Sequence, residues 1–342
     1  MKLTQNQKTI LSICTFVIVF AILLLIATFF DLQISQILTK NSLKPGEYIT
    51  NDFFASFMEI FGSAPAAILL GISAIILFLN VMRFLKGWKK WLFGIITGVL
   101  SVYAFYYFLS DVWKYAFKHI LYEQGILSTI EINLSSNYSS SSWFIATILA
   151  ISILIDLFAI FAMNKVNDET LKKLLKFAVV VIIVAGIPTI LINLIIKKPW
   201  GRIRYRAMNM YGDDPIYGFS AFTPWYNPKG QWLDNNTKLA IFGSTDVLKS
   251  FPSGHTAAAG ATYALLALPK ILDKEDNKKL VAIVWTISIL WTTLCAIGRI
   301  VAGAHFMSDV LFGGTMAFLC YAGAKEFYLN KSKNLKALFA KK

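Results

Sequence analysis

Long apolar runs recur along the chain and are separated by short polar or basic stretches. Each run is close to the ~20 residues that an α-helix needs to cross the hydrocarbon core of a bilayer. The pattern therefore predicts an all-α polytopic membrane protein with about eight transmembrane helices. The expected spans are residues 9–30, 62–82, 91–110, 143–163, 177–196, 254–272, 281–298 and 306–325.

The loops between these spans differ in charge, and the difference predicts their orientation. Short loops rich in lysine and arginine stay in the cytoplasm, so both termini are expected inside the cell. The loops at 31–61 and 111–142 carry few lysines and are expected outside, with a flexible Ser-rich part at 135–142. The basic stretches are residues 2–8, 83–90, 172–176, 270–279 and 331–342.

Composition narrows the class of protein further. Of the 342 residues, 56% are hydrophobic and 15% are charged, whereas average soluble domains carry about 25% charged residues. A water-soluble globule is therefore excluded. The net charge of +14 comes largely from loop lysines, so no nucleic-acid partner is expected. The first run is too long for a signal peptide of ordinary design and is interpreted as an uncleaved anchor.

Three polar islands interrupt the apolar pattern, and two of the three histidines lie in them. Alternation from a cytoplasmic N-terminus puts all three islands on the outer face. Their cations break the positive-inside pattern there, which indicates a local use for them. The islands read Lys197-x6-Arg204, Phe251-Pro-Ser-Gly-His255 and Arg299-x5-His305-x3-Asp309.

The third island pairs an imidazole with a carboxylate. His305 and Asp309 are four residues apart, so a helix beginning near Ala304 would stack them on one face. A carboxylate in contact with one imidazole nitrogen fixes the tautomer and leaves the other nitrogen with a directed lone pair. This arrangement suits a nucleophile or a base. A His–Asp pair that merely closes a helix end is the alternative.

The second island has the features of a helix start that binds an anion. Ser253 can cap the helix that begins after it, and Gly254 lets the backbone approach a ligand closely. Free backbone N–H groups at a helix start attract anions, and His255 would point into the same space. An ordinary cap with an interfacial histidine is the alternative.

The first island is a cluster of cations. A phosphate needs several charged donors at once, and Lys197, Arg204 and Arg299 supply them. Lys198 and Arg206 are better interpreted as interfacial anchors. His119 and the carboxylate of Asp156 lie outside the islands, and both are expected to have structural rather than catalytic roles.

Taken together, the islands resemble the motifs of the type 2 phosphatidic acid phosphatase family, also called the lipid phosphate phosphatase and vanadium haloperoxidase superfamily. The family pattern is Lys-x6-Arg-Pro, then Pro-Ser-Gly-His, then Ser-Arg-x5-His-x3-Asp. All three motifs occur here in order and with the right internal spacing, over roughly residues 190–325. Single motifs are weak evidence, but the conjunction is highly specific.

The resemblance implies a role for each matching residue. His305 would attack phosphorus to form a phosphohistidine, Asp309 would hold and polarise it, and His255 would protonate the leaving oxygen. The family needs no metal, and the sequence has no carboxylate cluster suited to Mg²⁺, so no cofactor is expected. The phosphoryl oxygens would be held by Lys197, Arg204, Ser253, Gly254 and Arg299.

Two positions depart from the family pattern. Tyr205 stands where the family has Pro after the arginine, and Gly298 stands where it has Ser before the arginine. The resemblance also implies a six-helix core, so two extra N-terminal spans are expected. The chain then divides into extra spans at 1–90, a phosphatase core at 91–325 and a basic cytoplasmic tail at 326–342. The core includes an aromatic-rich outer loop at 206–251, expected to form a partly ordered lid.

The function implied is a metal-independent lipid phosphatase of the cell membrane that acts at the outer face. The lipid remains open among polyprenyl diphosphate, phosphatidylglycerol phosphate and phosphatidic acid, and recycling of a polyprenyl carrier in a bacterial envelope fits an outer-face site best. Two alternatives remain: a lipid phosphotransferase that uses the same phosphohistidine, and a non-catalytic membrane transporter or scaffold. The oligomeric state is left open.

Overall fold

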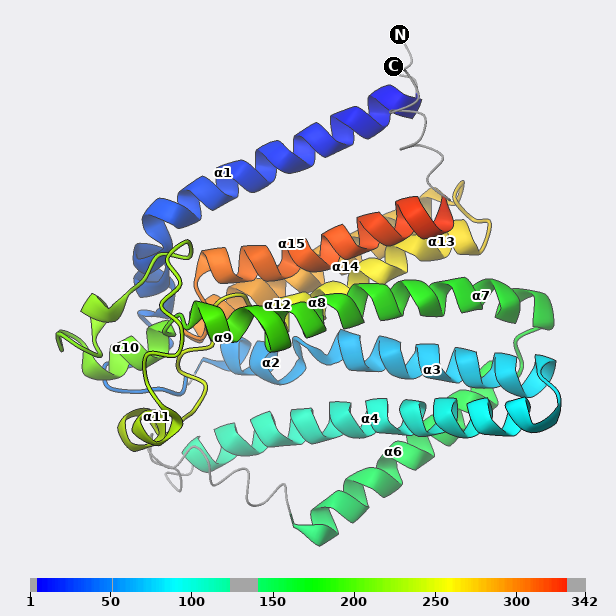
Figure 1. The fold of residues 1–342 in the computed structure, drawn as a ribbon, viewed down its shortest axis with the longest axis horizontal. Coiled ribbons are helices and arrows are strands. Elements are labelled where there is room, and N and C mark those ends of the chain that lie inside the picture. The colour runs from blue at the N-terminus through cyan, green and yellow to red at the C-terminus, as the bar shows by residue number, and fades with distance from the viewer. Residues whose placement is uncertain (1–4, 51, 124–140, 331–342) are drawn as a thin grey trace.

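The apolar runs fold into long helices that lie roughly side by side (Figure 1). The computed structural model describes residues 5–50, 52–123 and 141–330, and in these it contains helices and no strand. The elements are α1 (Gln5–Thr39), α2 (Phe53–Phe61), α3 (Ala64–Phe84), α4 (Gly87–Glu123), α6 (Ser142–Met163), α7 (Asp168–Val181), η1 (Ile182–Gly186), α8 (Ile187–Ile190), η2 (Leu191–Ile196), α9 (Lys197–Trp200), α10 (Tyr205–Tyr211), η3 (Phe219–Ala221), α11 (Asn235–Phe242), α12 (Gly254–Ala259), η4 (Gly260–Ala267), α13 (Leu268–Ile271), α14 (Lys278–Val301), α15 (Met307–Gly323) and η5 (Ala324–Leu329).

The protein is a multi-pass membrane protein. Within the described ranges, 7 helical runs are long and apolar enough to cross a bilayer. The expected span at 254–272 corresponds to a further run, α12 to α13, which Figure 1 shows passing between the same two ends of the bundle. The seven runs are Ile13–Thr39, Phe53–Phe84, Gly87–Ile120, Ser142–Met163, Asp168–Tyr211, Lys278–Val301 and Met307–Leu329.

The bundle has two different ends (Figure 1). The start of α1, the α3–α4, α6–α7 and α13–α14 connections and the end of η5 lie at one end. The segments that carry the three islands lie at the opposite end, together with α10 and α11. The basic loops and the islands are therefore separated by the length of the bundle. Most of the Ser-rich stretch 135–142 and the tail 331–342 fall outside the described residues.

Helices extend into the described parts of both expected outer loops, so the predicted boundaries of these loops were wrong. Helix α1 continues to Thr39, α2 covers Phe53–Phe61, and α4 continues to Glu123. In α1 the reason is visible: Asp31, Ser35 and Thr39 are all buried, and their spacing of four places them on one face of the helix. The polar residues that were interpreted as part of a loop therefore form the inward face of a helix. This helix extends beyond its apolar run.

Local signals in the sequence set several helix boundaries. The Asp52 side chain accepts a hydrogen bond from the Ala55 N–H and caps α2, and Asn277 caps α14 in the same way. Pro188 lies between two π-helical segments, η1 and η2. Proline lacks an N–H and clashes with the preceding turn, and wider turns on either side keep the helix continuous.

The segment 206–251 is ordered and has a hydrophobic core of its own. It contains α10, η3 and α11, and the Tyr211 hydroxyl donates to the Ile241 carbonyl oxygen at 2.6 Å. This core also includes residues 43–49, from the connection between α1 and α2. Its buried members are Leu43, Tyr48, Ile49, Ile203, Tyr205, Ala207, Met208, Ala221, Phe242, Val247, Leu248 and Phe306. The core forms a cap over the island end of the bundle.

Candidate active site

The three islands meet at one place. Backbone hydrogen bonds join the segments that carry the three islands. The segment of the first island is bonded to the residues just before the second island and to the third island, and the second island is bonded to the third. These bonds fix the relative positions of the motifs before any side chain is considered. They are Ser250 N to Arg202 O at 3.0 Å, Arg206 N to Gly303 O at 2.8 Å, and Ser253 N to Asp309 O at 2.9 Å.

His305 is held in one tautomer. Its side chain is 1% exposed, and Nδ1 lies 2.6 Å from the carbonyl oxygen of Ser250. Because a carbonyl oxygen only accepts, Nδ1 carries the proton and the lone pair is on Nε2. Burial, together with the nearby charges of Arg204 and Arg299, holds the pKa of His305 well below its usual value. The imidazole is therefore neutral at neutral pH, as a nitrogen nucleophile must be.

Asp309 does not form a direct hydrogen bond with His305. Its Oδ2 lies 3.7 Å from Nδ1 of His305, which is too long for a hydrogen bond. The carboxylate instead accepts from the Phe306 N–H at 2.8 Å and from the Ser250 hydroxyl. It therefore fixes the turn that carries His305. It also fixes Ser250, whose carbonyl oxygen orients the ring. This differs from the direct contact expected from the four-residue spacing.

Arg202 joins the third island to α1, a role that no sequence pattern indicates. Its Nη1 donates to Asp309 Oδ1 at 2.6 Å, and its Nη2 contacts Asp31 Oδ2 at 2.9 Å. The guanidinium also lies 4.2 Å from the centroid of the Phe306 ring. Asp31 in turn accepts from the Ser308 N–H at 2.9 Å. One cation is thus shared between two buried carboxylates, which is how buried charges are tolerated.

Lys197 lies beside the second island. A Cβ placed on Gly254 would be only 3.2 Å from Lys197 Nζ, so the lysine ammonium group lies at the start of α12. Lys197 Nζ donates to Asn193 Oδ1 at 3.0 Å, one helical turn earlier. Asn193 therefore orients this lysine.

The two phosphate-site arginines each face a carboxylate. Arg204 Nη2 lies 3.4 Å from Asp246 Oδ2, and its Nε donates to the Asp246 carbonyl oxygen at 3.0 Å. Burial alone would raise the pKa of Asp246, but the charges of Arg204 and Arg206 hold it below its usual value. Arg299 Nη1 lies 3.2 Å from Oε1 of Glu59, but neither Nη1 nor Nε of Arg299 has a hydrogen-bond partner.

The second island forms the helix cap that its sequence predicts. The Ser253 side chain accepts from the Thr256 N–H at 3.3 Å and is fully buried. His255 follows on the first turn of α12, with its ring edge-on to Tyr115 at a centroid distance of 5.6 Å. His255 Nε2 is buried and has no hydrogen-bond partner. A buried polar nitrogen without a partner is costly, which indicates a site that a ligand completes.

Some residues interpreted as interfacial lie inside the protein. Arg206 is 4% exposed and His119 is 7% exposed, and both contact Glu59. The anchor interpretation was wrong for Arg206, because a buried carboxylate in a neighbouring helix attracts it. Lys198, by contrast, is exposed.

Comparison with known proteins connects this geometry to a family. Residues 173–333 match the model of the PAP2 superfamily. This segment belongs to the PAP2 superfamily. Its members are phosphoric ester hydrolases, so the protein is a membrane phosphatase. Neither the curated proteins nor the solved structures give a match.

Both departures from the PAP2 pattern have structural explanations. Tyr205 is the first residue of α10, a position where proline is also tolerated. Here the tyrosine ring stacks on Phe219, with centroids 5.9 Å apart, inside the cap. At Gly298, a Cβ would come within 2.5 Å of Met58. Glycine is therefore required because α2 packs directly on α14.

No group of three or more His, Cys, Asp or Glu side chains in the described part of the protein could hold a metal ion. The titratable side chains around His305 are organised instead as ion pairs with arginine and lysine.

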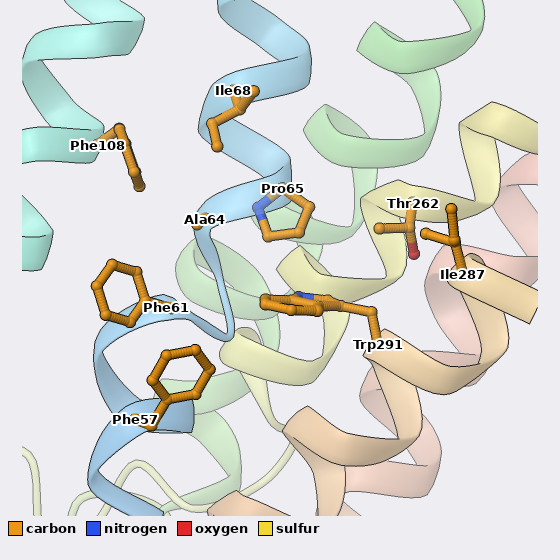
Figure 2. A pocket seen from close by; sticks show the side chains of 9 residues that line it. All are labelled: Phe57, Phe61, Ala64, Pro65, Ile68, Phe108, Thr262, Ile287 and Trp291. Atoms are coloured by element: carbon orange, nitrogen blue, oxygen red, sulfur yellow. The ribbon is translucent and has the colours of Figure 1, made fainter. Parts of the chain in front are cut away.

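An apolar pocket of about 420 Å³ lies between α2, α3, α4, α14 and η4 (Figure 2). Trp291 lies on α14 eight residues before Arg299, so the pocket begins roughly 12 Å from the charged centre. Ile287 at its rim is 48% exposed, which opens the pocket toward the lipid-facing surface. The lining residues are Phe57, Phe61, Ala64, Pro65, Ile68, Phe108, Thr262, Ile287 and Trp291.

Proposed function

We propose that this PAP2 protein hydrolyses the phosphate ester or diphosphate of a membrane lipid through a phosphohistidine. Nε2 of His305 attacks phosphorus, and the bond from phosphorus to the lipid oxygen breaks as the N–P bond forms. His255 gives its proton to the leaving oxygen. His255 then takes a proton from water, which attacks the phosphohistidine, releases phosphate and regenerates His305.

One observation carries this proposal: backbone hydrogen bonds join the segments of the three islands around His305, whose Nδ1 is held by the Ser250 carbonyl oxygen so that the lone pair is on Nε2. Lys197, Arg204 and Arg299 approach the same place, since the charge of each contributes to the lowered pKa of His305. Together with Ser253 and the Gly254 N–H they would hold the phosphoryl oxygens. These fixed donors would stabilise the charge that develops on the oxygens in the transition state.

The apolar pocket supports a lipid as the substrate. A headgroup bound by Arg299 would leave its apolar chain along α14, where Trp291 faces Phe57 and Phe61 (Figure 2). Burial of the chain there would contribute to binding at roughly 25 cal/mol per Å² of apolar surface. A long-chain polyprenyl diphosphate is the first candidate, followed by phosphatidylglycerol phosphate and phosphatidic acid.

The proposed site lies on the outer face of the cell membrane, with both termini in the cytoplasm. The support is the separation of charge: basic loops at one end of the bundle and the islands at the other (Figure 1). A membrane-impermeant thiol reagent tests this in intact cells. Ser220→Cys on the cap should be labelled, whereas Lys165→Cys in the α6–α7 connection should not.

The reaction is tested by measuring phosphate release from a panel of polyprenyl phosphates, diphosphates and phospholipids, with and without a divalent-metal chelator. Release that is independent of metal and inhibited by vanadate is expected. A phosphotransferase would release far more product when an acceptor alcohol is added, and a transporter would release none. Absence of an acid-labile phosphoenzyme in rapid-quench samples would contradict the covalent step.

The pocket is tested separately by filling it. Ala64→Trp should lower kcat/KM for long-chain substrates and leave a short-chain, water-soluble phosphate ester nearly unaffected. Ala146→Trp, the same change on an exposed position of α6, is the control. Equal losses on both substrates would contradict a role for the pocket in binding the chain.

A further inference from the structure

A buried carboxylate outside the PAP2 match, Glu59 on α2, lies directly behind the phosphate site. Its side chain is 1% exposed. A carboxylate in such a place must be paired, because its desolvation is costly. It has four basic neighbours: Lys118 Nζ at 2.9 Å, His119 Nε2 at 3.0 Å, Arg206 Nη1 at 3.3 Å and Arg299 Nη1 at 3.2 Å.

The two oxygens of Glu59 face two different parts of the chain. Oε2 contacts Lys118 and His119, which both belong to α4. Oε1 contacts Arg206 and Arg299, which both belong to the PAP2 segment. The α4 contacts therefore hold the carboxylate in place, and the other oxygen is directed at the two arginines.

Helix α2 is also fixed against α14 on both sides of Glu59. One residue before it, Met58 packs on Gly298 so closely that a Cβ there would lie 2.5 Å away. Three residues after it, the Gly62 carbonyl oxygen accepts from Trp291 Nε1 at 3.0 Å. Gly298 immediately precedes Arg299, so the spacing between Glu59 and this arginine is set by rigid backbone.

We propose that Glu59 is a positioning residue for phosphate binding, acting through Arg299. The Glu59 carboxylate attracts one end of the guanidinium at 3.2 Å, and both Nη1 and Nε have no hydrogen-bond partner and can donate to phosphoryl oxygens. An arginine with five donors in a fixed plane binds phosphate well only when that plane is correctly oriented. The N-terminal helices thus complete a site whose reactive groups all lie in the PAP2 segment.

This inference rests on the proposed function, and a double-mutant cycle separates the two. Glu59→Gln should lower kcat/KM on the order of 10²-fold, since small misplacements of a binding group cost that much, and should weaken vanadate inhibition. Arg299→Lys keeps the charge but loses the planar fork. In the Arg299→Lys background, Glu59→Gln should change kcat/KM by less than about threefold, because coupled residues are not additive.

Each outcome of the cycle has a defined meaning. If the two effects multiply, Glu59 does not act through Arg299 and the inference is wrong. If Arg299→Lys alone leaves activity unchanged, the phosphate role proposed for Arg299 fails instead. Asp156→Asn is the matched control, because Asp156 is another buried carboxylate in a membrane helix, without contact to the site. It should leave vanadate inhibition unchanged.

A second variant covers the case in which Glu59→Gln does not fold. Glu59→Asp keeps the charge and shortens the side chain by one methylene. A positioning role predicts weaker vanadate inhibition for this variant, and predicts that the loss disappears in the Arg299→Lys background. Wild-type inhibition by vanadate in Glu59→Asp would show that only the charge is needed and would overturn the inference.

Discussion

Two buried ion networks hold the two sides of the site, and their compositions are opposite. On the side of the nucleophile, one guanidinium, that of Arg202, lies between two carboxylates, Asp31 and Asp309. On the side of the phosphate, one carboxylate lies among several cations. Glu59 faces Lys118, Arg206 and Arg299.

The difference in charge corresponds to the chemistry proposed for each side. The Asp309 carboxylate accepts from the Ser250 hydroxyl, and the Ser250 carbonyl oxygen keeps the proton on Nδ1 of His305 and so the lone pair on Nε2. Excess positive charge around Arg299 attracts an anionic headgroup. Asp31 and Glu59 come from α1 and α2, outside the PAP2 match. The motif residues supply the reactive groups, whereas the N-terminal helices supply the charges that orient them.

The largest effect is expected where the nucleophile itself is removed. His305→Ala should reduce phosphate release by about 10⁴-fold or more, as loss of a covalent nucleophile does in other enzymes. The ion network behind it does not include the imidazole, so the thermal stability in detergent should change little. Retention of most activity in a clean preparation would contradict the phosphohistidine mechanism.

In the network of Arg202, Asp31 and Asp309, replacement of the single cation should have the largest effect on stability. Arg202→Met would leave Asp31 and Asp309 buried without a counter-charge, a change that costs about 3–5 kcal/mol. The free energy of unfolding in detergent measures this loss. Lys173→Met, which removes a cation from a solvent-exposed ion pair, should be nearly silent. Equal stability of the two variants would show that the Arg202 network is not structural.

The sequence predicted the membrane architecture because apolar runs are a local pattern, and the roles assigned to the candidate reactive groups stay a prediction. Apolar runs give the spans, and Lys197, His255 and His305 stand at fixed motif spacings. Chain order and short spacing also sufficed to predict that the islands share one end of the bundle.

The residues that orient the reactive groups could not be predicted in the same way. Glu59 lies more than a hundred residues from Arg299, and Asp31 lies more than a hundred residues from Arg202. Nothing nearby in the sequence signals either contact. Both carboxylates stand in stretches interpreted as loops. Their pairing depends on how α1 and α2 pack on α14 and α15. That packing is tertiary, and only residues such as Gly298 hint at it.

Two neighbouring lysines of the first island differ in their placement and can be compared. Lys197 lies at the second island, whereas Lys198 is exposed. Lys197→Ala should lower kcat/KM about 10- to 100-fold, the loss typical of one charged hydrogen bond. Lys198→Ala should stay within about twofold. Equal effects of the two changes would mean that general surface charge, not placement, attracts the substrate.

The smallest effect concerns the pH dependence that the cations impose on the histidine. Burial and the charges of Arg204 and Arg299 lower the pKa of His305, so the neutral form should persist below pH 6.5 and be lost only as the pH falls through the lowered value. The acid limb of kcat/KM, which reports groups of the free enzyme, should lie in that range. Arg204→Met removes one cation and should move the limb to higher pH by up to about one unit. Ionisation of the substrate is common to both proteins, so the difference between the two profiles belongs to the enzyme. An unchanged or downward shift would mean that Arg204 does not act on His305, and that the positive side of the site is electrostatically separate from the nucleophile.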